Sequence, residues 1–389
     1  MAEKKKRRYR VGIVGYGFIG RVHAYGHLNL PLFYRPLPFE TKITHVSTRH
    51  EETARAGREE IGAEHAVTDF REITENPDVD IVHICSPNSA HYEQLLSAMA
   101  HGKAIYCDKP LVADAREAEG IRKALETYRG CFGMTLQNRF FPATLRARQL
   151  MEEGFVGRVL AFRGAYLHSG STDPKAPLKW KLSGEAGGGV IADLGAHILD
   201  LMDHLVGDFR RVSTATLTAY PTRPDASNPG KTVPVDAEDH VAVLVSAGPE
   251  ASGGVGVIEA SKVATGTEDE LRFEIHGTTG GLRFNCMRPN VLEVYRQDAS
   301  DQPLGGFRGW QAVDSGQRYP EPAAKFPGPK FSIGWIRSHM ACLAAFLFAL
   351  HEGKTPQPDV RQGLYVQDMI ESVRRSAAEG GWVDVPERR

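Results

Sequence analysis

The chain has 389 residues, more than a single hydrophobic core usually supports, and 41% of them are hydrophobic, so we expect a globular protein of two domains. Its 47 basic and 48 acidic residues give a net charge of −1, which excludes a global attraction to nucleic acid or to a membrane surface. The basic stretch KKKRRYR (4–10) is expected to be a solvated terminus, and no segment has the roughly 20 apolar residues that a membrane span needs.

Five widely spaced cysteines indicate free thiols rather than a disulfide framework or a metal-binding pair. Free thiols are typical of a reducing compartment, so we expect the cytoplasm. A glycine-rich turn follows the basic stretch, where a signal peptide would carry an apolar region. The cysteines are Cys85, Cys107, Cys131, Cys286 and Cys342.

Apolar runs alternate with helical stretches over the first third of the chain. Such alternation predicts βαβ units, and hence a doubly wound α/β sheet of parallel strands with helices on both faces. The expected strands are 10–17, 41–49, 65–69, 79–87, 104–110 and 131–140, and the expected helices are 19–30, ended by Pro31, 51–62, 90–102 and 114–130.

The pattern changes near residue 138, where strand-like segments with few helices between them predict an α+β domain with a large, mostly antiparallel open sheet. We therefore expect a dinucleotide-binding domain over 1–137 and a substrate and oligomerisation domain over 138–389. The stretch 221–234 is expected to be a surface loop. The expected strands are 158–167, 210–220, 239–248, 254–264, 271–285 and 291–297, and the expected helices are 142–153, 331–353 and 361–380.

The segment VGIVGYGFIGRVHA (11–24) places three glycines between a strand and a helix. In that context Gly15 makes a tight turn, Gly17 lets a pyrophosphate approach the backbone, and Gly20 lets the helix pack on the strand. The free N–H groups and dipole of the helix N-terminus favour an anion there. The sequence therefore predicts a site for NAD or NADP.

The acidic residue expected at the end of the second strand, where it would bind the adenine-side ribose, is missing. Thr48 and Arg49 stand there instead. A hydroxyl followed by a guanidinium suits a 2′-phosphate better than a bare 2′-hydroxyl, although an arginine also stacks on adenine. The sequence thus leans modestly toward NADP.

Three further motifs give the chain a resemblance to a known family: ICSPNSAHYE (84–93), AIYCDKPL (104–111) and GGGVIADLGAHILDL (187–201). Together with the glycine turn, they resemble those of the glucose–fructose oxidoreductase, inositol dehydrogenase and MocA (Gfo/Idh/MocA) family over nearly the whole chain. The resemblance implies an NAD(P)-binding Rossmann domain, followed by an α+β domain whose open sheet often forms homodimers or homotetramers.

The resemblance also implies roles for individual residues. Lys109 matches the active-site lysine, and Asp193 and His197 match the catalytic pair. Asp108 replaces the usual glutamate with a side chain one methylene shorter at the nicotinamide ribose, and a cis bond is expected before Pro110. The residues expected to line the cofactor are Gly15, Gly17, Phe18, Ile19 and Gly20 at the pyrophosphate, with Ser86, Pro87, Asn88, His91, Asp108 and Lys109 toward the nicotinamide.

The segment 193–205, taken as a helix, carries one apolar face and a narrow stripe of Asp193, His197, Asp200 and His204. We interpret Asp200 and His204 as a solvated polar face. Asp193 and His197 follow a glycine loop suited to a close ligand and are interpreted as functional. Their spacing would permit a chelate, but no further ligand of clear type lies nearby, so we expect no metal.

Hydride transfer from a secondary alcohol requires that the hydroxyl proton leave and that charge on the oxygen be stabilised. His197 is the expected general base, because an imidazole titrates near neutrality. Asp193 orients it or stabilises the imidazolium, and Lys109 hydrogen-bonds the oxygen.

The expected partner is a small-molecule sugar or polyol, with no nucleic acid and no membrane. Trp180 is a candidate for stacking on a sugar ring, and it is equally explained as a core residue. Gln137, Asn138 and Arg139, expected at the end of the sixth strand, are candidates for binding hydroxyls. The loop YLHSGSTDPKAPLKW (166–180) resembles that of family members acting on cyclic sugars and inositols, which favours an inositol- or anhydrosugar-like substrate.

Two alternatives to the dehydrogenase remain. One is an NAD-retaining glycosidase that works by oxidation and elimination. The other is a non-catalytic, dinucleotide-sensing regulator. The joint presence of Lys109, Asp193 and His197 favours an enzyme over the regulator.

Overall fold

The computed structural model describes residues 6–248 and 253–388, and of the basic stretch only residues 4 and 5 lie outside them. The chain divides into two compact units. Within the described ranges, no helix combines the length and the apolar character needed to cross a membrane. The first unit comprises Met1–Gln137, Arg318–Phe331 and Ile336–Leu364, and the second comprises Asn138–Gln317, Ser332–Trp335 and Tyr365–Arg389.

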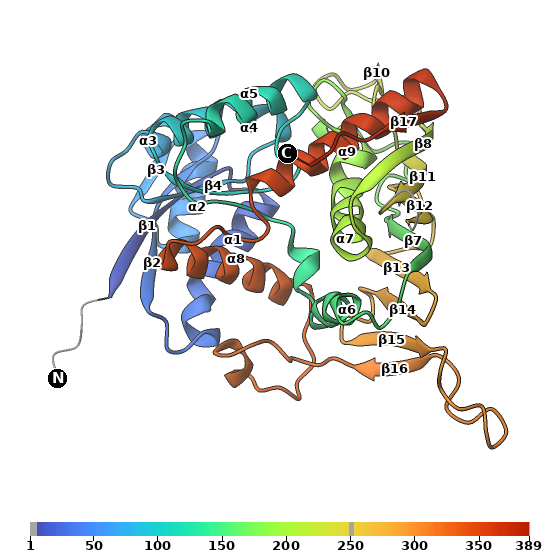
Figure 1. The fold of residues 1–389 in the computed structure, drawn as a ribbon. Helices are drawn as coiled ribbons and strands as arrows, with labels where there is room; N and C mark the ends of the chain where they lie inside the picture. The colour runs from blue at the N-terminus through green and yellow to red at the C-terminus, as the bar shows by residue number, and fades with distance from the viewer. Residues whose placement is uncertain (1–5, 249–252, 389) are drawn as a thin grey trace, which may run out of the picture. The chain divides into compact units, whose positions relative to one another are not determined.

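The first unit contains a six-stranded sheet of order β3-β2-β1-β4-β5-β6, with every neighbouring pair parallel. Helices lie on both of its faces (Figure 1), so the expected doubly wound α/β class is confirmed. Its strands are β1 (Arg7–Val14), β2 (Phe39–Ser47), β3 (His65–Val67), β4 (Ile81–Ile84), β5 (Ala104–Cys107) and β6 (Phe132–Met134), and its helices are α1 (Phe18–Phe33), α2 (Glu51–Ile61), α3 (Arg71–Thr74), α4 (Asn88–Ala100) and α5 (Ala115–Leu125).

A helix from late in the sequence completes the first unit. Most of α8 (Trp335–Glu352) packs on this sheet, although we expected all residues after 137 to form the second domain. A Cβ added at Gly133 would lie 2.7 Å from the Phe346 ring, and the Cys342 thiol donates to the Met134 carbonyl at 3.6 Å. The parallel strands are buried on both faces, so the apolar face of α8 supplies cover that the first 137 residues do not.

The second unit is built on a nine-stranded sheet of order β16-β15-β14-β13-β7-β12-β11-β8-β17. Only β7 and β12 pair in parallel, so the expected mostly antiparallel sheet is confirmed. The helices are α6 (Pro142–Glu152), α7 (Ala196–Val206) and α9 (Val360–Glu379). The strands are β7 (Val159–Leu167), β8 (Phe209–Leu217), β11 (His240–Ala247), β12 (Gly254–Ser261), β13 (Glu270–Gly277), β14 (Gly280–Asn285), β15 (Val291–Arg296), β16 (Gln311–Asp314) and β17 (Trp382–Asp384), with a separate ribbon of β9 (Thr222–Pro224) and β10 (Thr232–Pro234).

Several element boundaries differ from the sequence expectation. Helix α1 continues through Pro31 to Phe33, because a proline so near the C-terminus removes only one backbone hydrogen bond. The sixth strand ends at Met134, and the segment Gln137–Phe140 is a 3₁₀ helix rather than a strand end. The ribbon of β9 and β10 lies inside the stretch expected to be a loop.

The interpretation of Asp200 and His204 as a solvated face is wrong. Asp200 is buried and accepts two hydrogen bonds from Arg139, at 2.7 Å from Nε and 2.5 Å from Nη2. His204 is mostly covered as well, and burial together with Arg139 lowers its pKa to about 2. Asp200 faces Arg139, which is close in space but 61 residues away in sequence. The periodicity of the helix alone therefore does not reveal that these polar side chains are buried.

Helix α1 is joined to the sheet by three buried histidines. His83 on β4 contacts both α1 histidines, with its Nδ1 at 2.9 Å from His23 Nδ1 and its Nε2 at 3.0 Å from His27 Nε2. In a neutral imidazole one nitrogen donates and the other accepts, and burial keeps the three rings neutral because it lowers the pKa of each. Burial lowers the pKa of His27 to about 3.

This arrangement predicts that acid destabilises the first unit. The pKa of His27 is lower in the folded state than in the unfolded state. The stability that neutral His27 gives to the fold is therefore fully present above about pH 6.5 and is lost as the pH falls toward 3. Between pH 7 and pH 5, the unfolding free energy of His27→Phe should fall by about 2 kcal/mol less than that of the wild type. Urea titrations at both pH values measure this, with the exposed His101→Gln as control. Equal pH dependence in all three proteins would contradict it.

Candidate active site

The turn between β1 and α1 has the geometry of a dinucleotide cradle. Gly15 has a φ of +91°, and a Cβ there would lie 2.6 Å from the Cys85 backbone. A Cβ at Gly20 would lie 2.2 Å from the Gly15 carbonyl oxygen. A Cβ at Gly17 would meet no atom within 4 Å, so the space above this glycine is open. The first and third glycines therefore serve packing, and the second leaves its backbone accessible.

The start of α1 fits an anion. Gly17 is its N-cap and supplies no side-chain hydrogen bond, and the first turn contains no acidic residue. Phe18 and Ile19 follow, with Phe18 71% exposed. Backbone N–H groups at a helix start bind phosphate well, so these residues fit the pyrophosphate of a dinucleotide.

Thr48 and Arg49 lie directly after β2, as the sequence predicts. The Thr48 hydroxyl donates to the His50 carbonyl at 2.9 Å and lies 2.5 Å from the Thr53 hydroxyl. Arg49 is exposed at the carboxyl end of the strand. A guanidinium in this place is accessible to a phosphate group of a ligand.

The loops after β4 and β5 are joined by His91. Its Nε2 lies 2.9 Å from the Ser86 carbonyl oxygen, and its Nδ1 lies 3.1 Å from that of Pro110. The ring is fully buried, and burial lowers its pKa. His91 was expected to flank the cofactor, but it is enclosed and holds the two loops together. Ser86 itself donates to Gln94 at 2.7 Å.

The segment after β5 carries Asp108 and Lys109, both half-buried. The backbone N–H of Asp108 donates to the Ile84 carbonyl at 2.9 Å, which fixes this segment beside the end of β4. The Lys109–Pro110 peptide is cis, as expected. Pro87 and the buried Asn88 stand at the start of α4 on the neighbouring loop. Cofactor-binding candidates thus gather at the carboxyl ends of β1, β2, β4 and β5, where open α/β sheets bind ligands.

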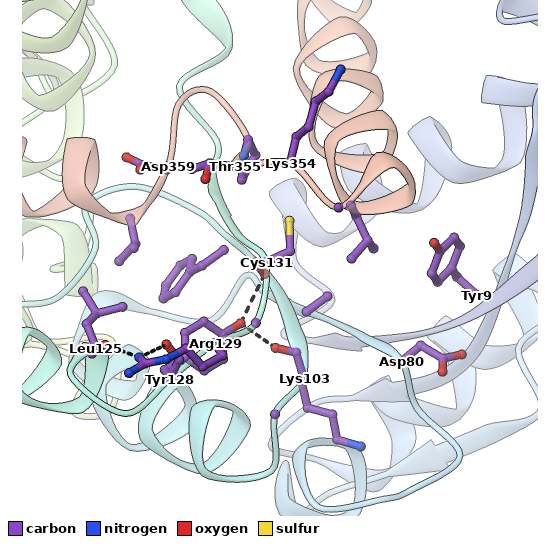
Figure 2. Close-up of a pocket in the computed structure, with 18 of the residues that line it drawn as sticks. Tyr9, Asp80, Lys103, Leu125, Tyr128, Arg129, Cys131, Lys354, Thr355 and Asp359 are labelled. Atoms are coloured by element: carbon purple, nitrogen blue, oxygen red, sulfur yellow. Dashed lines mark hydrogen bonds between the residues drawn. The ribbon is translucent and has the colours of Figure 1, made fainter.

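A cavity of about 730 Å³ opens at the opposite, amino end of these strands (Figure 2). Tyr9, Lys103 and Cys131 lie on its walls, together with Lys354 after α8. The Tyr128 hydroxyl donates to the Lys103 carbonyl at 2.6 Å, and Arg129 donates to the Tyr128 carbonyl at 2.9 Å. None of the predicted site residues lines this cavity, so its size does not make it the cofactor site.

In the second unit, Asp193 lies in a π-helical turn, Ile191–Gly195, that leads into α7. Gly189 precedes this turn with a φ of +104°, and a Cβ there would lie 2.5 Å from the Glu238 carboxylate. That carboxylate accepts a hydrogen bond from the Ile191 N–H at 3.0 Å. The glycine is thus required where Glu238 caps the turn, and such π turns are frequent at functional sites.

Two lysines hold the Asp193 carboxylate. Lys181 Nζ lies 3.0 Å from Oδ1 and 3.2 Å from Oδ2, and Lys262 Nζ lies 3.5 Å from Oδ2. Lys262 is 6% exposed and also donates to the Lys181 carbonyl at 2.9 Å. Sequence reasoning missed both lysines. Lys262 follows β12, far from Asp193 along the chain, so no local pattern marks it.

His197 is buried on the first turn of α7, and its ring centroid lies 5.7 Å from that of Tyr166 on β7. The Tyr166 hydroxyl donates to Asp269 at 2.7 Å, and His168 Nε2 contacts the same oxygen at 2.8 Å. Burial, Asp269 and Asp193 all raise the pKa of Tyr166. The second unit therefore places His197 beside Tyr166, whose hydroxyl is held with His168 by Asp269, three side chains that the sequence analysis missed. Asp193 lies four residues before His197 on the same segment.

The proposed substrate residues have different environments. Arg139 donates two hydrogen bonds to the buried Asp200, so we no longer assign it to substrate hydroxyls. Gln137 Oε1 and Asn138 Nδ2 are buried and have no hydrogen-bond partner among the described residues. Trp180 is 38% exposed, and Lys181 Nζ lies 5.8 Å from its ring centre.

The described residues contain no group of three or more histidine, cysteine, aspartate or glutamate side chains arranged to hold a metal ion.

Comparison with known proteins identifies the family. Residues 9–135 match the Gfo/Idh/MocA model described as an oxidoreductase family with an NAD-binding Rossmann fold. Residues 148–385 match the model for the C-terminal alpha/beta domain of the same oxidoreductase family.

Individual relatives agree with this match. The chain is 32% identical to levoglucosan dehydrogenase of Pseudarthrobacter phenanthrenivorans, over 97% of this chain and 98% of that protein. It is 25% identical to inositol 2-dehydrogenase of Rhizobium meliloti, over 95% and 97% of the two chains. A solved structure of levoglucosan dehydrogenase in complex with NADH and levoglucosan matches with a TM-score of 0.90 at 32% identity, over 98% of this chain and all of that chain. The chain therefore belongs to the Gfo/Idh/MocA oxidoreductase family and is a nicotinamide-dependent dehydrogenase acting on CH–OH groups.

Proposed function

We propose that the protein transfers a hydride between nicotinamide and a secondary alcohol of a cyclic polyol or sugar, inositol- or anhydrosugar-like. The observation that carries this proposal is the cluster of Asp193, His197 and Tyr166 in the second unit. It is supported by similarity over nearly the whole chain to proteins named for levoglucosan and inositol oxidation.

In this proposal His197 is the general base. It accepts the hydroxyl proton of the substrate and becomes an imidazolium. Asp193, held by two ammonium groups, retains its negative charge and stabilises that imidazolium. Lys109 hydrogen-bonds the substrate oxygen and stabilises the negative charge that develops on it. When bound, the nicotinamide supplies the hydride acceptor.

The substrate class is inferred from the remaining polar groups. Gln137 Oε1 and Asn138 Nδ2 are a buried acceptor and a buried donor suited to neighbouring hydroxyls. Trp180 offers a partly exposed ring face, the usual partner of a pyranose or inositol ring. The levoglucosan complex supports a cyclic substrate, since levoglucosan is an anhydrosugar.

We propose NADP as the preferred dinucleotide within the general NAD-binding fold. Arg49 is exposed after β2, and the described loop contains no acidic residue at that strand end. A guanidinium forms charge-assisted hydrogen bonds with a 2′-phosphate.

We also propose that the protein is a homodimer or homotetramer assembled through the large sheet. On the face opposite α7, Leu244, Val255 and Val257 are 47%, 58% and 40% exposed, and Leu244 pairs directly with Val257. Contiguous apolar side chains on an open sheet are typical of an interface. A second copy of the chain supplies a matching face.

The base assignment predicts that His197→Ala loses about 10²–10⁴ in kcat. The Kd for the dinucleotide should not change, because the cradle lies in the first unit. Steady-state kinetics and a fluorescence titration measure the two quantities, with His276→Ala on the outer sheet face as control. A His197→Ala enzyme with wild-type kcat would refute the assignment.

The dinucleotide assignment predicts that Arg49→Ala lowers kcat/KM with NADP about 10- to 100-fold, the loss expected for a charged hydrogen bond. The value with NAD should change little. Arg55→Ala, whose guanidinium pairs with Glu51 on α2, is the matched control. The assignment would be excluded if the wild-type enzyme preferred NAD and Arg49→Ala left the ratio of kcat/KM with NADP to kcat/KM with NAD unchanged.

The assembly proposal predicts that Val257→Lys yields monomers, because it places a charge in the centre of the apolar face. Size-exclusion chromatography with light scattering measures the mass. Leu304→Lys is the control, since Leu304 is fully exposed but lies off the sheet. An unchanged oligomer in Val257→Lys would argue against the sheet as the interface.

A further inference from the structure

Lys262 is an ammonium group in an unusual position. Its side chain is almost completely buried at the end of β12, where a lysine is ordinarily exposed. Its backbone is fixed on both sides, since its N–H donates to the Asp239 carbonyl at 2.8 Å and its carbonyl accepts from the Ser171 N–H at 2.9 Å. The side chain is therefore directed by a rigid segment.

Two contacts of the Lys262 ammonium lead to Asp193. One is the carboxylate itself, at 3.5 Å, and the other is the backbone carbonyl of Lys181, at 2.9 Å. Lys181 in turn contacts both carboxylate oxygens with its own ammonium. Lys262 thus contacts Asp193 directly, and it also holds the backbone of Lys181, the more exposed lysine that pairs with the same carboxylate.

Fold stability does not explain this burial. Removing an ammonium group from water is costly, and replacing a buried ion pair by apolar groups is often neutral or stabilising. Lys103 provides a comparison within the same chain. It is equally buried at 6% exposure, but its ammonium donates to the backbone carbonyls of Asn76 and Val79 rather than to a carboxylate at a candidate site.

The surroundings show what the charge of Lys262 acts on. Around Asp193 stand Lys181, Lys262 and the capping Glu238. Beside His197 stands Tyr166, with Asp269 and His168 on its hydroxyl side. Asp193 lies four residues before His197 on the segment that opens α7, a spacing at which side chains of a helix are neighbours.

We propose that Lys262 is a positioning residue of the dehydrogenase reaction, which holds Asp193 in place as an anion and balances its charge beside the base His197. This inference rests on the proposed function, because it takes His197 as the base. Lys262 itself transfers no proton and no hydride. Its positive charge limits the stabilisation that Asp193 gives to the imidazolium, so His197 stays uncharged to lower pH.

The test is the pH profile of kcat/KM for Lys262→Met in the full-length enzyme, with a polyol that the wild type oxidises. Without the cation, Asp193 stabilises protonated His197 more strongly, so the uncharged base appears only at higher pH. The acid limb should therefore move up by about 0.5–1 pH unit. At the pH optimum, kcat/KM should fall about 10- to 100-fold, the usual effect of misplacing a reacting group.

Three further variants separate positioning from a merely structural role. Lys262→Arg keeps the charge and should keep the wild-type acid limb. Lys103→Met should leave the acid limb in place, whatever it does to thermal stability. In an Asp193→Asn background, Lys262→Met should cost far less of the plateau kcat/KM than it does in the wild type, because the group that it positions is altered.

The outcomes are distinguishable. If His197→Ala stays active, the proposed function fails and the inference fails with it. If His197→Ala is inactive while Lys262→Met has the wild-type acid limb, only the inference is overturned. An acid limb displaced equally in Lys262→Arg and Lys262→Met, or an equal loss of kcat/KM with and without Asp193, would also overturn it. Where Lys262→Met does not fold, the Lys262→Arg profile and the Asp193→Asn comparison made with Lys262→Gln decide.

Discussion

The proposed active site depends on one carboxylate that is kept charged while mostly removed from water. Asp193 has a 14% exposed side chain and two ammonium groups within 3.5 Å. A carboxylate in that setting is a poor proton acceptor and a stable source of negative potential. In the proposed reaction, the imidazole of His197 is then the group that exchanges a proton. The π turn that opens α7 is what presents the carboxylate to those lysines, and Gly189 with Glu238 fixes that turn.

The first unit depends on a different constraint, which is the close approach of backbone segments around the glycine turn. Gly15 lets β1 and the loop after β4 touch, and Gly20 lets α1 pack on the turn. Gly17 leaves space for a ligand. The buried chain of His23, His27 and His83 then ties α1 to β4, so the helix start that would bind pyrophosphate is held in place by the core. Family membership and this geometry agree on a nicotinamide dinucleotide.

Much of this was predictable from the sequence, because it depends on local spacing. The glycine turn and the pair Asp193 and His197 each lie within a short stretch of sequence, and so does each single strand or helix of the first unit. Lys262 was not predictable, since only the folding of β12 beside the π turn brings it to Asp193. Asp200 was misjudged for the same reason, because its partner Arg139 lies 61 residues away. Helix α8 belongs mostly to the first unit, where it buries a face of the parallel sheet. Its apolar sequence shows that it packs on a sheet but not on which of the two sheets.

The proposed reaction is a net oxidation of an alcohol, rather than a transient oxidation or dinucleotide binding without oxidation. The direct measurement is the absorbance at 340 nm, together with product analysis, when the purified protein is given NAD or NADP and a panel of inositols, aldoses and anhydrosugars. We expect reduced dinucleotide to form in a 1:1 ratio with a ketone or lactone product from at least one cyclic compound. Release of a sugar from a glycoside with no net reduced dinucleotide would contradict it, as would binding of dinucleotide without turnover of any compound in the panel.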